Sequence, residues 1–218
     1  MTNCNNGKKS FSVIFNSTSL RILFIAALIF MAGACAPATQ NIDMHNDQGG
    51  AVMGLDYRDF EQAASESVSS MMQSGALNKR GGGRYVLAIS RIINDTTQRI
   101  DTDQLVKKIR VQLLQSGKVI VTTAVGANGP EDNMAMQARE LRNSDEFNQS
   151  TVAAKGQMIA PDLSLSGKII QRIIRVSSSL QQVEYYFQMT LTDINTGLAY
   201  WEDESVIGKR GSNKSVPW

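Results

Sequence analysis

Three consecutive segments in the last third of the chain, each patterned like a β-strand, most constrain what this sequence can fold into. The segments span residues 163–176, 183–194 and 198–207. In the second segment the apolar residues recur at every second position, which is the period of a strand: Tyr185, Phe187, Met189 and Leu191. Short polar turns at 177–179 and 195–197 separate the segments. Since short turns join antiparallel neighbours, the pattern predicts an antiparallel meander.

The region before the meander has the pattern of a strand, a helix and a second strand. Residues 85–93 form an apolar run that is typical of a buried strand, and residues 119–123 form a shorter one. Between them, Leu105, Ile109 and Leu113 lie on one helical stripe. This order favours parallel strands. We therefore expect an α/β fold, in which a single mixed β-sheet has helices packed on it.

Two further helices are expected on either side of this unit. Residues 56–74 place apolar side chains at helical spacing, with Asp56 or Asp59 as the N-terminal cap and Gly75 at the end. A second helix opens at 129–132, and we expect Met134, Ala138 and Leu141 to face inward from it. We expect the C-terminal tail, residues 209–218, to be loose.

The sequence lacks the residue types that most catalytic and metal sites need. It has one histidine, His45, and two cysteines, Cys4 and Cys35. A Ser-His-Asp triad, a Cys-His nucleophile pair and a Cys/His zinc site are therefore excluded from the folded part. Gly81, Gly82 and Gly83 do not end in the Lys-Ser/Thr of a phosphate-binding loop and precede a strand, so we interpret them as a linker.

The remaining candidates for catalysis are carboxylates, and each has a simpler explanation. Asp101 and Asp103 lie at a helix start, where the backbone dipole favours acids. Glu202, Asp203 and Glu204 follow one another in a strand, so their side chains alternate between faces and cannot converge. We therefore expect a protein that is not an enzyme and that uses no cofactor or metal.

The N-terminus has the features of a bacterial export signal. Lys8, Lys9 and Arg21 precede an apolar run of eleven residues, 22–32, which is shorter than the roughly 20 residues that span a bilayer. Small residues then lead directly to Cys35, which resembles the lipobox of lipoproteins. We expect cleavage after residue 34 and lipidation of Cys35. An uncleaved anchor, or an ordinary signal with a chance cysteine, is the alternative. By the same resemblance, Ala36 favours the outer membrane.

A tether and a nearly neutral domain follow the signal. Residues 35–55 are rich in Ala, Asn, Asp and Gly without a period, so we interpret them as the lipidated N-terminus and a flexible tether. The domain is expected over 56–218. The whole chain has 22 basic and 20 acidic residues; the signal removes three basic ones and no acid, which leaves 19 and 20 and a formal charge of −1. This balance gives no reason to expect nucleic-acid binding.

The order of several short motifs resembles a known family. INDTTQRIDTDQL, LLQSGKVIV and DLSLSGKII are followed by YYFQMTLTDINTGLAYWEDESVIGKRG. Over about residues 56–210 this pattern resembles the LpoB family of lipoprotein activators of penicillin-binding proteins. The resemblance implies a domain similar to the N-terminal domain of TolB. It also implies a lipid-anchored outer-membrane protein, facing the periplasm, that stimulates a bifunctional peptidoglycan synthase. The tether, about twenty residues long, is shorter than in the best-known members.

Two functional hypotheses follow. In the first, the protein binds and allosterically activates a bifunctional penicillin-binding protein; in the second, it is a structural or secretion-linked envelope lipoprotein related to the curli secretion lipoprotein. For the first, the meander is the candidate partner surface, because helices on one side of a sheet leave the other face available. Glu202 and Glu204 are its candidate partner-binding residues, facing a basic patch of the partner. Alternatively, these acids only keep an edge strand soluble.

Overall fold

The computed structural model describes residues 42–44, 46, 50 and 52–215. The expected signal peptide, the expected lipidation site Cys35 and His45 lie outside these residues. The chain divides into two units, residues 1–43 and 44–218, and every element described below belongs to the second unit.

The domain has five strands and three α-helices within the described residues. In chain order the elements are α2 (Tyr57–Gln73), β1 (Tyr85–Asp95), α3 (Asp103–Gln115), β2 (Val119–Val121), α4 (Asn133–Glu140), the 3-10 turn η1 (Leu141–Asn143), β3 (Leu163–Arg175), β4 (Leu180–Asp193) and β5 (Ala199–Ser212). One sheet in the order β2-β1-β3-β4-β5 contains all five strands. β1 pairs in parallel with β2 and β3, whereas β3, β4 and β5 pair antiparallel. The expected single mixed sheet, parallel unit and meander are confirmed.

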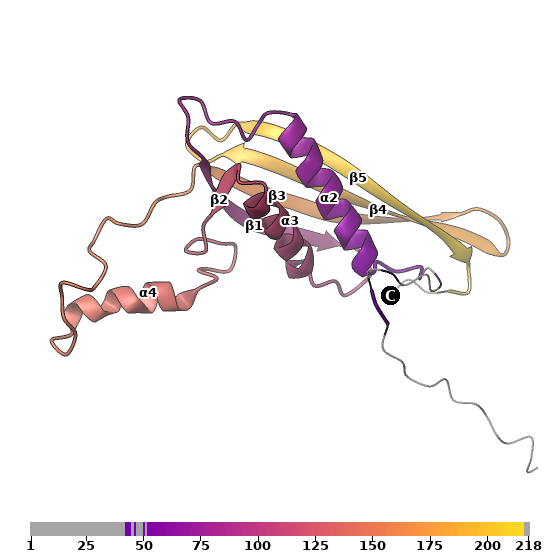
Figure 1. Cartoon of the computed structure of the whole chain (residues 1–218). Helices are drawn as coiled ribbons and strands as arrows, with labels where there is room; N and C mark the ends of the chain where they lie inside the picture. The colour runs from indigo at the N-terminus through magenta and orange to yellow at the C-terminus, as the bar shows by residue number, and fades with distance from the viewer. Residues whose placement is uncertain (1–41, 45, 47–49, 51, 216–218) are drawn as a thin grey trace, which may run out of the picture. The chain divides into compact units, whose positions relative to one another are not determined.

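Helices α2 and α3 lie on the same face of the sheet (Figure 1). α2 begins with a capping box, in which the Asp56 carboxylate accepts hydrogen bonds from the backbone of Arg58 and Asp59 while the Asp59 carboxylate accepts one from the Asp56 N–H. Every second residue of β4 from Val183 to Leu191 is buried, which is the alternation expected from the sequence. The core therefore lies between the two helices and this face of the sheet.

The start of β3 is fixed to β1 by one aspartate. The Asp162 carboxylate accepts hydrogen bonds from the Val86 N–H and from Lys79 Nζ, both at 2.8 Å. The Asp162 N–H in turn donates to the Val86 carbonyl at 2.7 Å. These bonds hold the pKa of Asp162 below its ordinary value, chiefly through the Lys79 hydrogen bond and then that of Val86. Asp162 thus fastens the start of β3 to β1 and to Lys79.

Two expectations from the sequence are wrong. α4 forms where expected, with Asp132 as its cap, but it contains no buried residue and Met134 is 66% exposed. Its apolar stripe does not face inward, because no element of the described domain covers it. The tail is not loose from residue 209 onward, because β5 continues to Ser212 and pairs with β4 along its whole length.

Candidate partner-binding surface

The face of β3, β4 and β5 opposite the helices is the surface on which the two candidate glutamates lie. We call it the open face and define it by five cross-strand rows, each given from β3 through β4 to β5. The rows are Ser166–Thr190–Glu202, Lys168–Gln188–Glu204, Ile170–Tyr186–Val206, Arg172–Glu184–Gly208 and Ile174–Gln182–Arg210. Acids lie on β5 in the first two rows, an apolar row lies in the middle, and cations lie on β3 (Lys168, Arg172) and at the end of β5 (Arg210).

Glu202 and Glu204 are exposed on this face, and the residues between and beside them point the other way. Trp201 and Ser205 are buried against α2, where the Trp201 Nε1–H donates to Ser70 Oγ at 3.2 Å. The expected alternation of the acidic run is therefore confirmed, and its three carboxylates do not form a cluster. On the open face, Gln188 Nε2 donates to Glu204 Oε2 at 2.7 Å and Thr190 Oγ1 donates to Glu202 Oε1 at 3.3 Å. Both carboxylates keep accessible oxygens for a partner.

The middle of the open face is a mixed apolar and charged surface. Val206 is 47% exposed beside Tyr186, whose hydroxyl donates to Glu184 Oε2 at 2.6 Å. This bond, and then a second one from Gln182, hold the pKa of Glu184 below its ordinary value. The bond to Glu184 in turn raises the pKa of Tyr186. Lys168 forms a salt bridge with Asp95 at 2.6 Å. Apolar area surrounded by charges of both signs is typical of protein–protein contact.

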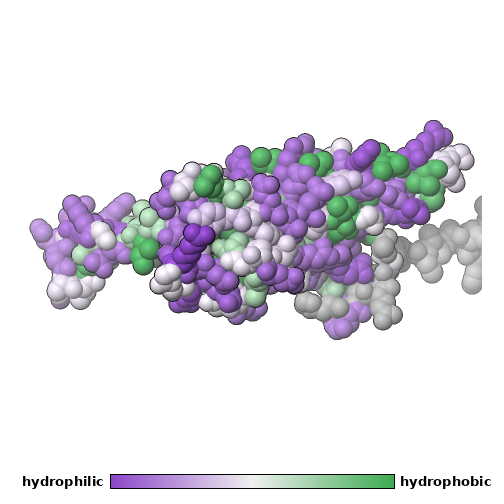
Figure 2. All heavy atoms as spheres, turned by 90° about the horizontal axis from the view of Figure 1, so that it is seen from above, coloured by the Kyte–Doolittle hydropathy of each residue, from purple (hydrophilic) through white to green (hydrophobic). Residues whose placement is uncertain are grey.

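Seen from above, hydrophobic residues form small separate patches among hydrophilic ones (Figure 2). Among the described residues, no helix is long and apolar enough to cross a membrane. In the same residues no group of three or more His, Cys, Asp or Glu side chains is placed to hold a metal ion.

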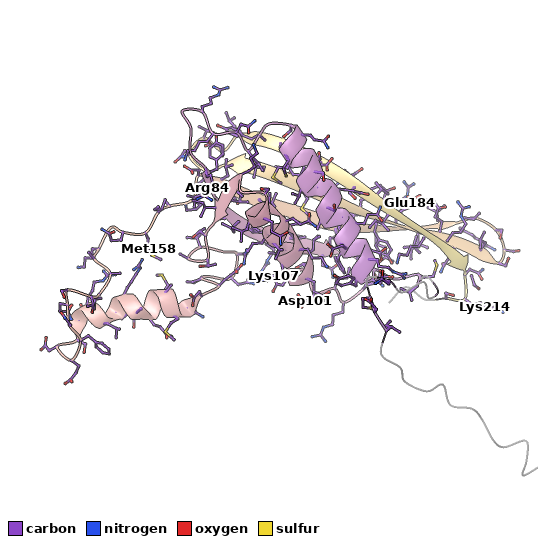
Figure 3. The ribbon with its side chains drawn as sticks, in the orientation of Figure 1. Arg84, Asp101, Lys107, Met158, Glu184 and Lys214 are labelled. Atoms are coloured by element: carbon purple, nitrogen blue, oxygen red, sulfur yellow. The ribbon has the colours of Figure 1, made fainter. Side chains whose placement is uncertain are left out.

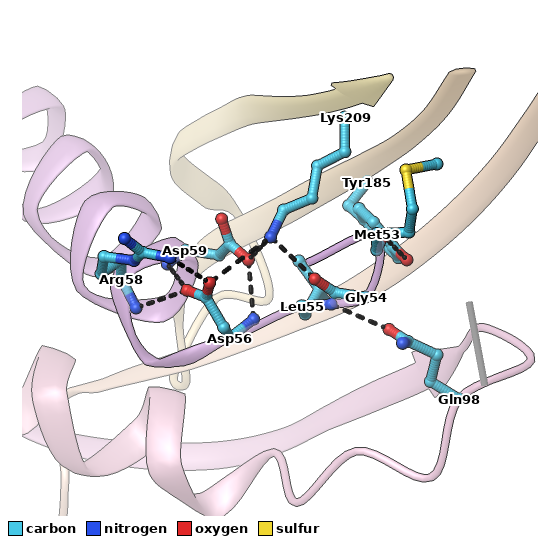
Figure 4. A network of polar contacts seen from close by, with 9 residues as sticks. All are labelled: Met53, Gly54, Leu55, Asp56, Arg58, Asp59, Gln98, Tyr185 and Lys209. Atoms are coloured by element: carbon cyan, nitrogen blue, oxygen red, sulfur yellow. Dashed lines mark hydrogen bonds and ion pairs between the residues drawn. The ribbon is translucent and has the colours of Figure 1, made fainter. Parts of the chain in front are cut away.

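Sequence reasoning missed a buried polar network at the start of the domain (Figure 4). Lys209 Nζ lies 2.5 Å from Asp59 Oδ2 and 3.7 Å from Asp56 Oδ2, and it donates to the Gly54 carbonyl at 2.7 Å. Only 10% of the Lys209 side chain is exposed. Burial alone would raise the pKa of Asp56, but the Arg58 hydrogen bonds, the charge of Lys209 and the Asp59 N–H outweigh it and lower the pKa.

The same network holds the residues that precede α2. The Tyr185 hydroxyl donates to the Met53 carbonyl at 3.1 Å, and the Leu55 N–H donates to Gln98 Oε1 at 3.2 Å. Burial raises the pKa of Tyr185 to about 12, so this hydroxyl stays protonated as a donor at neutral pH. Met53 and Leu55 also pack against the core. The last residues of the expected tether are therefore bound to β4 and β5. We call residues 53–55 with Lys209, Asp56 and Asp59 the entry clamp.

Within the described residues these features define a small α/β domain whose sheet has helices α2 and α3 on one face and no helix on the other. The sequence model of the peptidoglycan-synthase activator LpoB family matches residues 59–207, so the chain belongs to this family. The family consists of regulatory activators that bind penicillin-binding proteins, and membership supports that role for this chain. Family homology also suggests a periplasm-facing lipoprotein.

Several solved structures are similar to this chain at low sequence identity. The LpoB C-terminal domain from Salmonella enterica is 15% identical with a TM-score of 0.41, and the one from Escherichia coli is 16% identical with a TM-score of 0.40. Each match covers 68% of this chain and 98% of the other. Lipoprotein GNA1162 from Neisseria meningitidis is 10% identical with a TM-score of 0.33, over 61% of this chain and 86% of the other. A comparison with curated protein sequences found no match.

Proposed function

We propose that this protein is a lipid-anchored lipoprotein of the outer membrane that binds a bifunctional penicillin-binding protein and activates it allosterically. The family match over residues 59–207 is the observation that carries the proposal. The signal-like N-terminus with Cys35 supports the lipid anchor, and Ala36 supports the outer membrane by resemblance. The comparisons do not favour the alternative of a secretion-linked lipoprotein.

An activator without reacting groups of its own can act only through its affinity for the synthase. It shifts the synthase toward an active conformation if it binds that conformation more tightly than the resting one. We propose the open face as the contact surface, with Glu202 and Glu204 facing a basic patch. Their exposure and the apolar row beside them support this choice. Exposed charges of this kind increase the association rate more than they increase the affinity.

The experiment is a binding titration between the full chain, purified in detergent, and the bifunctional synthase of the same organism. We expect the double variant Glu202→Lys, Glu204→Lys to bind about tenfold or more weakly, mainly through slower association. The control is Asp145→Lys with Glu146→Lys, which changes the charge equally on the exposed connection between β2 and β3. Equal affinities of wild type and the open-face variant would refute the proposed surface. No binding by the wild type would refute the proposed function.

A further inference from the structure

The edge of β1 is left unpaired over its second half. β2 pairs only with Tyr85–Leu87, and the last backbone bond on this side joins the Thr122 N–H to the Leu87 carbonyl at 2.9 Å. The chain then leaves the edge and passes the Ile89 carbonyl at Gly126. Within the described residues no strand pairs with this edge from Ser90 to Asn94. Over this stretch of about 17 Å the alternate residues that do not bond to β3 carry free backbone donors and acceptors, and the register with β3 shifts between Ile89 and Ile92.

A preformed groove runs beside this free edge. Its volume is about 860 Å³, and it is lined by residues 89–94 of β1, one side of α3 and the loop 126–131. The Arg110 guanidinium, which is buried on α3, donates two hydrogen bonds to the Glu131 carboxylate and so fastens the loop to the helix. The Arg110 bonds hold the pKa of Glu131 below its ordinary value, so this carboxylate stays ionised at neutral pH. The groove is therefore present before any ligand binds.

The chemistry of the groove specifies its occupant. Free backbone groups at strand spacing are matched only by another extended backbone, which adds a strand to the sheet. Val106, which is partly buried, supplies apolar surface on the side of α3. Arg91 and Lys107 are exposed in the lining, and within the described residues neither forms a salt bridge. Asp103 and Glu131 are the acids of the lining that partly offset them, and the charge of Lys107 contributes to the lowered pKa of Glu131. The groove lies apart from the open face. In Figure 3, Lys107 of the groove lining is well separated from Glu184 of the open face.

We propose that the groove binds an extended, acidic peptide segment of a partner protein, added as a strand to the edge of β1. The segment would continue the sheet where β2 ends. Its apolar side chains would pack against Val106 of α3, and its carboxylates would lie near Arg91 of β1 and Lys107 of α3. This second docking site is independent of the open face and of the proposed activation.

The test uses a displayed library of random linear nonapeptides selected on the full chain in detergent. Enriched peptides are expected to alternate apolar residues, to contain Asp or Glu, and to lack Pro in the middle. They should slow hydrogen exchange of the amides in residues 89–94. The variant Arg91→Glu, Lys107→Glu should bind them about tenfold or more weakly. The control Lys118→Glu, Lys155→Glu, at exposed sites outside the groove, should bind normally.

Several results would overturn the proposal. They are a library that gives no binder, peptides that bind the groove variant as well as the wild type, and peptides that leave hydrogen exchange at 89–94 unchanged. Protection of 89–94 in a dimer of the chain, without peptide, would assign the edge to a second copy instead.

Discussion

Replacing Lys209 by Met should destabilise the domain strongly, because it removes the only cation of the entry clamp that contacts both aspartates. Met keeps the apolar stem but removes the ammonium from the Asp59 carboxylate and the Lys209 hydrogen bond from the Gly54 carbonyl. The side chains of Lys209, Asp59 and Asp56 are only 10%, 11% and 17% exposed, so water replaces the lost ammonium poorly. Breaking one partner of a buried ion pair costs about 3–5 kcal/mol.

The remaining contacts place the expected loss at the lower end of that range. Asp56 keeps its salt bridge with Arg58 at 3.0 Å, and Asp59 keeps the hydrogen bond from the Asp56 N–H at 2.7 Å. We therefore expect Lys209→Met to lower the free energy of unfolding by about 3 kcal/mol. For a domain of this size this corresponds to a fall in Tm of about 6–12 °C.

The assay is urea unfolding of residues 36–218 at pH 7, with Lys214→Met as the control, because Lys214 is an exposed lysine near the same end of the chain. The double variant Lys209→Met, Asp59→Asn should be more stable than the sum of the two single losses predicts, since the neutral amide no longer needs the cation. A loss below about 1 kcal/mol, or the same loss in Lys214→Met, would refute the reasoning.

Three further predictions concern other parts of the chain. Gly167→Ala should destabilise the domain by about 1–3 kcal/mol, because a Cβ there would lie 2.6 Å from the Gln188 carbonyl oxygen. The control Gly208→Ala should be neutral, because no atom lies within 4 Å of the added Cβ. Equal unfolding curves for the two variants would contradict this prediction. Acid should destabilise the domain: Asp56 and Asp162 have folded pKa values below the ordinary 3.8, so their contribution is complete above 3.8 and is lost as the pH falls through the lowered values. Asp162→Asn should then lose less stability between pH 5 and pH 2 than the wild type does, whereas an equal loss would count against the Asp162 assignment. Mass spectrometry of the mature protein should find an acylated Cys35 as the first residue, and an unmodified cysteine or another first residue would refute lipidation.

The sequence predicts those parts of this fold that depend on local pattern. The period of β4 specifies its buried face, and the capping residues of α2 specify where that helix begins. The alternation of Glu202, Asp203 and Glu204 likewise follows from strand geometry alone.

The parts that the sequence does not predict depend on contacts between distant segments. Lys209 lies about 150 positions from its partners Asp59 and Gly54, so its position in a polar tail gives no sign that it is buried. The apolar stripe of α4 has helical period, but period does not say whether another element covers it. The groove beside β1 exists because β2 is only three residues long. The ends of strands are the part of a fold that a sequence pattern predicts least well.

The most direct test of the central claim is the rate of glycan polymerisation by the purified bifunctional synthase of the same organism, measured with increasing amounts of the full chain in detergent. The account predicts that the rate rises and saturates in parallel with binding, and that the chain alone polymerises nothing. A rate that stays constant at concentrations where binding is complete would contradict activation.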